Sequence, residues 1–500
     1  MRARGAVALL LAFLVPACAG STWIPLSRLS GWHAAQVGDT RLIGDLAPEE
    51  LERLARDLAR FDAIFAKLAG WPEAALTTPL TIYVFRNREI AERFGLGRGL
   101  AGWAFGALDA SFIALEISSG RDEDRNTLFH EYTHVLLRRN QRAPLPRWLD
   151  EGLACYFSTV SERDDAVVVG AAPGTFAARV ARHGALPLEQ LFAVPTESMR
   201  FDELADFYAS SWALSHYLMS TPSGRLELAA FAKQLARGVP SDQAQPAAFG
   251  RSNDQLGKEL AIHVAQLARG VAIETLIDAS AFAAPEPAPS VALDPHEVAY
   301  ALGTLALELA AAGGDEDTAH WPGLARNFLT LARVENAPNA PRVEAALGEA
   351  RALGGDADGA RAAEQAALAR APNDARIRLH AARAALLRAE GKELPAASPA
   401  LAEAEAQYQQ ALTLAPESAA AWFGLGQTWV RMGRSDDAFT AFETARSFGW
   451  SSRLDIALAR LHLERGERER AAELLRPIAL DSHGGPTQKE AAELLKQTHP

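Results

Sequence analysis

Apolar residues recur at every third or fourth position over several long stretches of the chain, and this spacing predicts amphipathic helices. The clearest of these stretches are residues 48–70, 126–139 and 201–219. Two shorter stretches, residues 80–85 and 111–117, are instead rich in β-branched and aromatic side chains, which favours strands. The first half of the chain is therefore predicted to combine helices and strands in an α+β domain.

The segment between the two predicted strands is rich in glycine. Gly97, Gly99 and Gly102 have the spacing of a dinucleotide-binding fingerprint. That motif requires a strand directly before it and a helix directly after it, whereas here a strand is expected to follow. Residues 95–106 are therefore interpreted as a flexible loop.

The second half of the chain has a different pattern. Residues 280–295 contain four prolines and many alanines, so residues 279–295 are predicted to be a Pro/Ala linker between two domains. Beyond it, small and apolar residues recur at intervals of about 34 residues, as in tetratricopeptide repeats (TPRs). One repeat is marked by Trp422, Leu425, Gly426, Trp429, Gly433, Ala438, Phe442 and Ala445. Residues 296–498 are predicted to form about five helix pairs in an all-α solenoid, with an irregular alanine-rich helical domain as the alternative.

Length and charge narrow the classes of function. Five hundred residues exceed what one hydrophobic core usually supports, which agrees with two domains. The formal net charge is −12, and phosphate binding requires a basic surface, so nucleic acid is not expected as a partner. Beyond the N-terminus no apolar run reaches the roughly 20 residues that cross a bilayer, so the mature chain is not expected to span a membrane.

The N-terminus has the pattern of an export signal. Two arginines precede an apolar stretch, and residues 1–20 are predicted to be a signal peptide. Residues 15–18 (VPAC) resemble a lipoprotein box in which Cys18 carries the lipid, whereas residues 17–19 (ACA) fit cleavage and release. An uncleaved anchor is the third alternative. We expect an exported protein of the periplasm or cell envelope, attached to a membrane only through a lipid on Cys18.

The strongest candidate for chemistry is the sequence HEYTH, which begins at His130. On a helix His130 and His134 share one face, so both imidazoles can bind one ion, and zinc accepts imidazole nitrogen. Glu131 lies about 100° around that helix and can reach a water on the ion without competing for the metal. Glu151 follows after a proline-bounded turn, so its carboxylate is expected to face the histidines from a second, antiparallel helix.

Two sequence segments together carry a family resemblance. The sequence HEYTHVLL, followed by PRWLDEGLA at residues 146–154, resembles the gluzincin zinc metallopeptidases, most closely the peptidase MA-like domain family. The resemblance covers about residues 80–220, and it implies a zincin-like metallopeptidase domain over residues 24–278. The expected fold class is therefore an α+β zincin-like domain followed by an all-α TPR solenoid.

The resemblance implies a role for each residue of the motif. His130, His134 and Glu151 would bind one Zn²⁺ per chain. Glu131 would be the general base that activates zinc-bound water, and afterwards the proton donor. Three protein ligands leave one position open, which is typical of a catalytic rather than a structural zinc site.

Other side chains have open alternatives. Tyr208 is similar in position to a tyrosine that stabilises the oxyanion in related peptidases, but it could equally be a core aromatic. Asp150 could orient a histidine or simply cap its helix. Cys155 stands where some gluzincins have an acidic residue; it could be a small buried side chain or a fourth ligand that closes the site. Residues 111–117 are expected to be the edge strand that binds extended substrate.

Two classes of function follow. The first is a zinc peptidase that acts on a protein or peptide substrate and recognises a protein partner through its TPR repeats. The alternative is a catalytically silent TPR scaffold or assembly factor of the cell envelope, in which any zinc would be structural. The intact HEYTH motif favours the peptidase, because a scaffold has no chemical need of Glu131.

Overall fold

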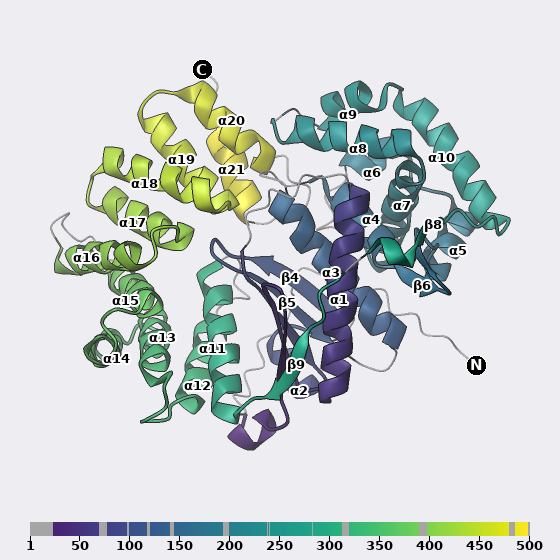
Figure 1. Ribbon diagram of the computed structural model, residues 1–500. Helices are drawn as coiled ribbons and strands as arrows, with labels where there is room; N and C mark the ends of the chain where they lie inside the picture. The colour runs from purple at the N-terminus through teal and green to yellow at the C-terminus, as the bar shows by residue number, and fades with distance from the viewer. Residues whose placement is uncertain are drawn as a thin grey trace.

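The computed structural model describes the following residues: 24–69, 78–97, 100–117, 121–140, 145–193, 200–237, 239, 241–282, 284–312, 320–389, 398–479 and 486–498. The predicted signal peptide and Cys18 lie outside these residues. The described chain forms a sheet domain, up to residue 292, and an arc of helices beyond it (Figure 1). No described helix is both long and apolar enough to cross a lipid bilayer.

A six-stranded sheet with the strand order β4-β5-β3-β2-β1-β9 is the centre of the sheet domain. The strands are β1 (His33–Val37), β2 (Thr40–Gly44), β3 (Leu80–Phe85), β4 (Gly102–Gly106), β5 (Ser111–Glu116) and β9 (Ala288–Ala292). Strands β2, β3 and β5 run parallel, and the remaining neighbours pair antiparallel. The strands predicted at residues 80–85 and 111–117 are confirmed.

Both faces of this sheet are covered. Alternate side chains of β3 enter two different cores: Ile82 and Val84 pack with α1 (Pro48–Ala69) and α3 (Arg121–Asn140), whereas Tyr83 and Phe85 pack with the first helices of the arc. Figure 1 shows α1 and α3 on one side of the strands and α11 on the other. A strand buried on both faces is nearly continuously apolar, and β3 has a single aliphatic hydroxyl residue, Thr81, among apolar and aromatic neighbours.

Two predictions for the sheet were wrong. The glycine-rich stretch contains β4, which pairs with β5 from Gly102 to Gly106, so the edge strand is β4 and not residues 111–117. The predicted linker contains β9, which pairs with β1 at the other edge, and Phe282 is buried in the core. Proline is tolerated on an edge strand because its missing N–H can face outward, so the proline-rich composition concealed this strand.

Helices after the sheet bring the rest of the domain around α3. The helix predicted to begin near Arg147 is α4 (Arg147–Phe157), and the one predicted over residues 201–219 is α7 (Phe201–Met219). A small second sheet has the order β6-β7-β8. Its strands and the remaining elements are β6 (Ser161–Arg163), β7 (Ala166–Val169), β8 (Thr275–Asp278), α2 (Arg88–Arg93), α5 (Gly174–His183), α6 (Leu188–Ala193), α8 (Pro222–Leu235), α9 (Ser241–Phe249), α10 (Asn253–Ala268), and the 3₁₀ helices Leu26–Leu29 and Ala279–Ala281.

The second half is all helical within its described residues and forms the arc, here called the repeat domain. Its helices are α11 (Pro295–Ala312), α12 (Trp321–Leu331), α13 (Ala340–Leu353), α14 (Ala357–Arg370), α15 (Ala375–Arg388), α16 (Pro399–Leu414), α17 (Ala419–Arg431), α18 (Ser435–Phe448), α19 (Ser452–Glu464), α20 (Arg468–Ala479) and α21 (Pro486–Lys496). From α11 to α20 successive helices pack as pairs, as predicted for a solenoid, and α21 packs on α20. Glycine permits the close pairing: a Cβ on Gly426 would overlap with the ring of Phe442.

The repeat domain begins directly on the sheet. Leu302 of α11 and Phe328 of α12 belong to the same core as Phe85 of β3. The hydroxyl of Tyr83 donates to the carbonyl of Ala301, with 3.0 Å between the two oxygens. The two halves therefore share a core, and no free linker separates them in the described chain.

Candidate metal centre

Three candidate ligands converge between α3 and α4. His130 and His134 lie one turn apart on α3, and their Nε2 atoms are 3.3 Å apart. Oε2 of Glu151, on α4, lies 3.4 Å from Nε2 of His130 and 3.7 Å from Nε2 of His134. The predicted convergence of these three side chains is therefore present in the structure, and they form a group that could hold a metal ion.

The spacing of these atoms fits a tetrahedral zinc ion. Zinc binds imidazole nitrogen and carboxylate oxygen at about 2.0–2.2 Å, so ligand atoms around a tetrahedral zinc lie roughly 3.3–3.6 Å apart. Glu151 is 0% exposed, and its Oε2 has no hydrogen-bond partner within the described chain. A buried carboxylate oxygen without a partner is costly, and a cation between the two imidazoles would provide that partner.

The other ring nitrogens of the histidines have unequal partners. Nδ1 of His134 lies 2.9 Å from Oδ1 of Asp150, and a carboxylate there makes Nδ1 the protonated nitrogen, which leaves the lone pair of Nε2 facing the site. Nδ1 of His130 instead faces the thiol of Cys155 at 3.9 Å. Asp150 therefore orients a histidine, one of its two predicted alternatives. Cys155 lies beside the outer nitrogen of His130 and outside the group of ligand atoms.

The other carboxylate oxygen of Glu151, Oε1, also has partners that hold this side chain in place. The hydroxyl of Tyr208 donates to Oε1 of Glu151 at 3.1 Å, and Nε of Arg147 lies 3.8 Å from the same oxygen. Burial alone would raise the pKa of Glu151, but the imidazoles of His130 and His134 and then the Arg147 guanidinium lower it to about 2. Glu151 is therefore held as a carboxylate, which is the form that binds a metal.

Tyr208 reaches Glu151 because α4 and α7 approach closely. A Cβ on Gly152 would overlap with the carbonyl of Ser211 and the hydroxyl of Ser215, so only glycine permits this contact. Tyr208 is 2% exposed, and burial, followed by the charge of Glu151, raises the pKa of its phenol. The phenol thus holds the carboxylate of a candidate ligand in place, and a role at an oxyanion would require it to leave Glu151.

Glu131 lies between the histidines and the edge strand. Its side chain is 2% exposed, and a Cβ built on Gly102 of β4 would lie 3.0 Å from its Cγ. Burial raises the pKa of Glu131, and the neighbouring His130 and His134 oppose that rise. Glu131 is thus a buried carboxylate that adjoins His130 in the sequence and lies outside the group of candidate ligand atoms.

The outer edge of β4 pairs with no other strand of the described chain. Ala101 and Ala107 make hydrogen bonds towards β5, so the alternation of an antiparallel ladder turns the N–H and C=O groups of Gly102, Ala104 and Gly106 away from it. The carbonyl of Ala104 accepts from Arg138 of α3 at 3.1 Å. An extended chain could therefore pair with β4 beside Glu131.

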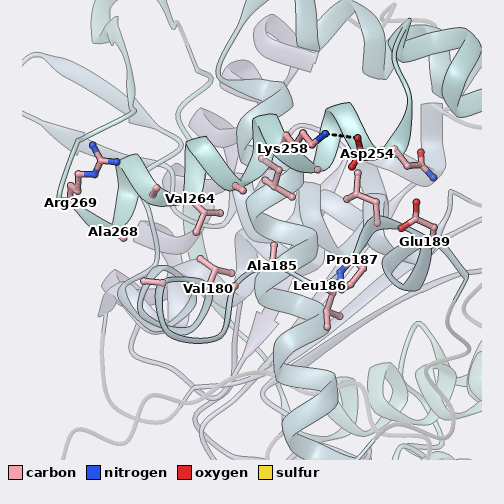
Figure 2. A pocket seen from close by; sticks show the side chains of 18 residues that line it. Val180, Ala185, Leu186, Pro187, Glu189, Asp254, Lys258, Val264, Ala268 and Arg269 are labelled. Atoms are coloured by element: carbon pink, nitrogen blue, oxygen red, sulfur yellow. Dashed lines mark hydrogen bonds and ion pairs between the residues drawn. The ribbon is translucent and has the colours of Figure 1, made fainter.

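A separate hollow between α5, α6 and α10 contains none of the candidate site residues (Figure 2). Its wall combines apolar side chains, including Val180, Leu186 and Val264, with the exposed ion pair of Asp254 and Lys258. Figure 2 shows the Val180 and Val264 side chains directed toward one another across it. We assign it no chemistry.

The comparisons with known proteins identify no relative of the candidate metal centre. The sequence matches no family model and no curated protein. Among solved structures, the chain is similar to a thermophilic TPR protein of Thermus thermophilus, with 18% identity over 39% of this chain and 99% of that one, and a TM-score of 0.33. It is also similar to a TPR protein of Parabacteroides merdae (18% identity, 41% and 85% of the chains, TM-score 0.29). A third match is PilF of Pseudomonas aeruginosa (17% identity, 41% and 90%, TM-score 0.29).

Two residues of this centre were not predicted from the sequence. Arg147 precedes Glu151 by four positions, the spacing of neighbours on one helix face, and this could have indicated the contact. Gly102 had been placed in a flexible loop, and only the pairing of β4 with β5 shows that it faces Glu131.

Proposed function

We propose that this protein is a zinc-dependent peptidase whose metal is held by His130, His134 and Glu151. The observation that carries the proposal is the set of three candidate ligand atoms 3.3–3.7 Å apart, one of them a buried carboxylate oxygen that has no hydrogen-bond partner in the described chain. The resemblance of the HEYTH and WLDEGLA segments to gluzincins supports the same assignment.

Each nearby side chain then has a defined task. Zinc in this site would supply a Lewis acid that polarises a peptide carbonyl and makes water more acidic. Glu131 would take the proton of the attacking water and deliver it to the leaving amine. Asp150 would keep Nδ1 of His134 protonated, and Tyr208 would hold Glu151 in place.

The remaining parts of the chain would select the substrate. The free edge of β4 would bind an extended peptide by backbone pairing, which favours internal peptide bonds over recognition of a chain terminus. The stacked helix pairs form an extended surface of the kind that binds proteins, so we infer that they recognise a protein substrate or partner. We further propose that the protein acts in the cell envelope, where its predicted signal peptide would direct it.

Metal analysis is the first test. Purified full-length protein should contain about one zinc per chain by mass spectrometry, and His134→Ala should lose it. His183→Ala is the matched control, because His183 is half exposed and hydrogen-bonds to Asp206 away from the centre. Absence of zinc from the wild type, even after reconstitution, would contradict the proposal.

A peptide-library digest then separates a peptidase from a scaffold. Glu131→Gln keeps the volume of the side chain but cannot accept a proton, so cleavage should fall by about a thousandfold or more, while zinc is retained. Glu123→Gln, an exposed carboxylate on the same helix, should cleave as the wild type does. If Glu131→Gln and the wild type bind zinc equally and neither cleaves any peptide, the scaffold alternative is favoured.

A further inference from the structure

The repeat domain returns to the sheet at the turn between β4 and β5. Oδ2 of Asp109 accepts from the hydroxyl of Ser418 at 2.5 Å, and its Oδ1 accepts from the backbone N–H of Ala420 at 3.0 Å. More than 300 residues separate these partners in the sequence. Strands β4 and β5 form the edge hairpin, and residues 107–110 are its tip. The tip is therefore bound to the first turn of α17.

This contact has the chemistry of a helix cap. The hydroxyl of Ser418 accepts from the N–H of Ala421, so Ser418 and Asp109 together satisfy two of the N–H groups that begin α17. A carboxylate at a helix N-terminus also interacts favourably with the helix dipole. Asp109 therefore supplies from the sheet domain a cap that α17 would otherwise lack at the N–H of Ala420.

Close packing accompanies the cap. Leu108 packs into the core formed by α18 and α19 of the repeat domain. A Cβ on Gly449, just after α18, would lie 2.7 Å from the carbonyl oxygen of Leu108 and 2.9 Å from Cβ of Ala419. The hairpin tip thus fits a site that a side chain at residue 449 would obstruct.

A short path connects this contact to the metal centre. β4 is only five residues long, and the Ala107 N–H bonds to the Ala110 carbonyl at 2.8 Å, which closes the turn tightly. The strand begins at Gly102, whose backbone lies against the side chain of Glu131. A displacement of the tip would therefore change the position of the strand that faces the general base.

We propose that Asp109 is a positioning residue through which the repeat domain fixes the edge strand beside Glu131. The inference rests on the proposed peptidase function. With Asp109 in this role, the peptidase would work at full rate only while α17 holds the hairpin tip. A partner that rearranges α17–α19 would thereby change the rate of cleavage.

Two substitutions at Asp109 test the role. Asp109→Ala removes both accepted hydrogen bonds, so kcat should fall about tenfold, since small misplacements of catalytic geometry are costly. Asp109→Asn keeps an acceptor and is a good capping side chain, so it should restore kcat to within about twofold of the wild type. Asp356→Ala is the matched control: Asp356 caps α14 through the N–H of Gly359, far from the hairpin, and its loss should leave kcat unchanged.

A second measurement does not depend on cleavage. Amide hydrogen exchange of residues 102–106 should become faster in Asp109→Ala, but not in Asp356→Ala, with zinc content equal in all three proteins. Gly449→Ala should act in the same direction as Asp109→Ala, whereas Gly323→Ala, which has open space around it, should not. Unchanged exchange of β4 in Asp109→Ala overturns the positioning role. If the wild type contains no zinc or cleaves no peptide, the peptidase proposal itself is contradicted.

Discussion

Two pairs of neighbouring histidines lie in the described part of the sheet domain, and the two pairs differ in the hydrogen-bond partners of their ring nitrogens. In the first pair, Nε2 of His130 and Nε2 of His134 are 3.3 Å apart and face Oε2 of Glu151, which has no hydrogen-bond partner in the described chain. In the second pair, Nδ1 of His216 lies 2.7 Å from Nε2 of His263, and Nε2 of His216 lies 2.8 Å from the carbonyl of Gly170.

The second pair is complete without any ligand. Nε2–H of His216 donates to Gly170, so its Nδ1 accepts from His263, and both rings can remain neutral. In the first pair, Asp150 holds the proton of His134 on Nδ1, so the lone pair of Nε2 points at the lone pairs of Glu151. Close histidines alone therefore do not indicate a metal. The indication is the buried Oε2 of Glu151, which lies 3.4 and 3.7 Å from two imidazole nitrogens and has no hydrogen-bond partner in the described chain.

The largest effect on zinc affinity is expected from removing the charge of Glu151, the carboxylate that faces His130 and His134. Glu151→Gln removes an anionic ligand, so zinc affinity should fall by roughly a hundredfold or more, measured by competition with a chelator. Glu349→Gln in the repeat domain is the control, because Glu349 is equally buried but already bonds to His380 at 2.6 Å. Zinc affinity should be unchanged in the control. Equal zinc affinity in Glu151→Gln and the wild type would remove the distinction between the two histidine pairs.

The unequal partners of His130 and His134 in the proposed metal centre predict the next effect. Asp150→Ala should lower zinc affinity about 10- to 100-fold, because a carboxylate that orients a histidine ligand is typically worth that much. Cys155→Ser should change it by less than about threefold, since a thiol 3.9 Å from Nδ1 of His130 is a weak partner. Isothermal titration of the metal-free proteins would measure both. A larger loss in Cys155→Ser than in Asp150→Ala would reverse our ranking of the two partners.

The pH dependence of stability tests whether His216 and His263 are both neutral in the folded protein. Burial, together with the neighbouring His216, lowers the pKa of His263 from an ordinary 6.5 to about 4. Between pH 4 and 6.5 the unfolded state binds more protons at His263 than the folded state does. The free energy of unfolding should therefore rise with pH over this range, and this gain is lost when the pH falls towards 4. The stability gained between these pH values should amount to roughly 3 kcal/mol.

Urea unfolding of the wild type and His263→Gln at several pH values would measure this gain. As the pH falls from 6.5 towards 4, the wild type should lose stability relative to His263→Gln, because only the wild type has to exclude a proton from His263. His183→Gln, at a half-exposed histidine, should follow the wild type. Parallel curves for His263→Gln and the wild type would show that His263 is not held neutral.

The sequence predicted those parts of the molecule in which local pattern and local structure agree. The helices α3, α4 and α7 follow from apolar spacing and prolines, and the convergence of His130, His134 and Glu151 follows from helix periodicity across one turn. Asp150 was also placed correctly as a candidate, since it stands beside a ligand on the second helix.

The parts that were missed depend on contacts distant in sequence. β4 and β9 are edge strands of five residues, and their glycine and proline content conceals the β pattern. The His216–His263 bond joins α7 to α10, and the Asp109 cap joins the sheet to α17; neither contact leaves a periodic signal. Pairing of this kind becomes visible only after the chain has folded back on itself.

The smallest expected effect concerns the carboxylate that adjoins the first histidine pair. A Cβ at Gly102 would lie 2.8 Å from Cδ2 of Leu115 and 3.0 Å from Cγ of Glu131, so Gly102→Ala should shift Glu131 by a few tenths of an ångström. We expect kcat to fall about fivefold with zinc affinity unchanged, because the ligand atoms are not crowded. Gly106→Ala, on the same strand with open space around it, is the control and should retain the wild-type kcat. If both variants cleave like the wild type, the contact between the edge strand and Glu131 does not set the geometry of proton transfer, and the difference between the two histidine pairs would concern metal binding alone.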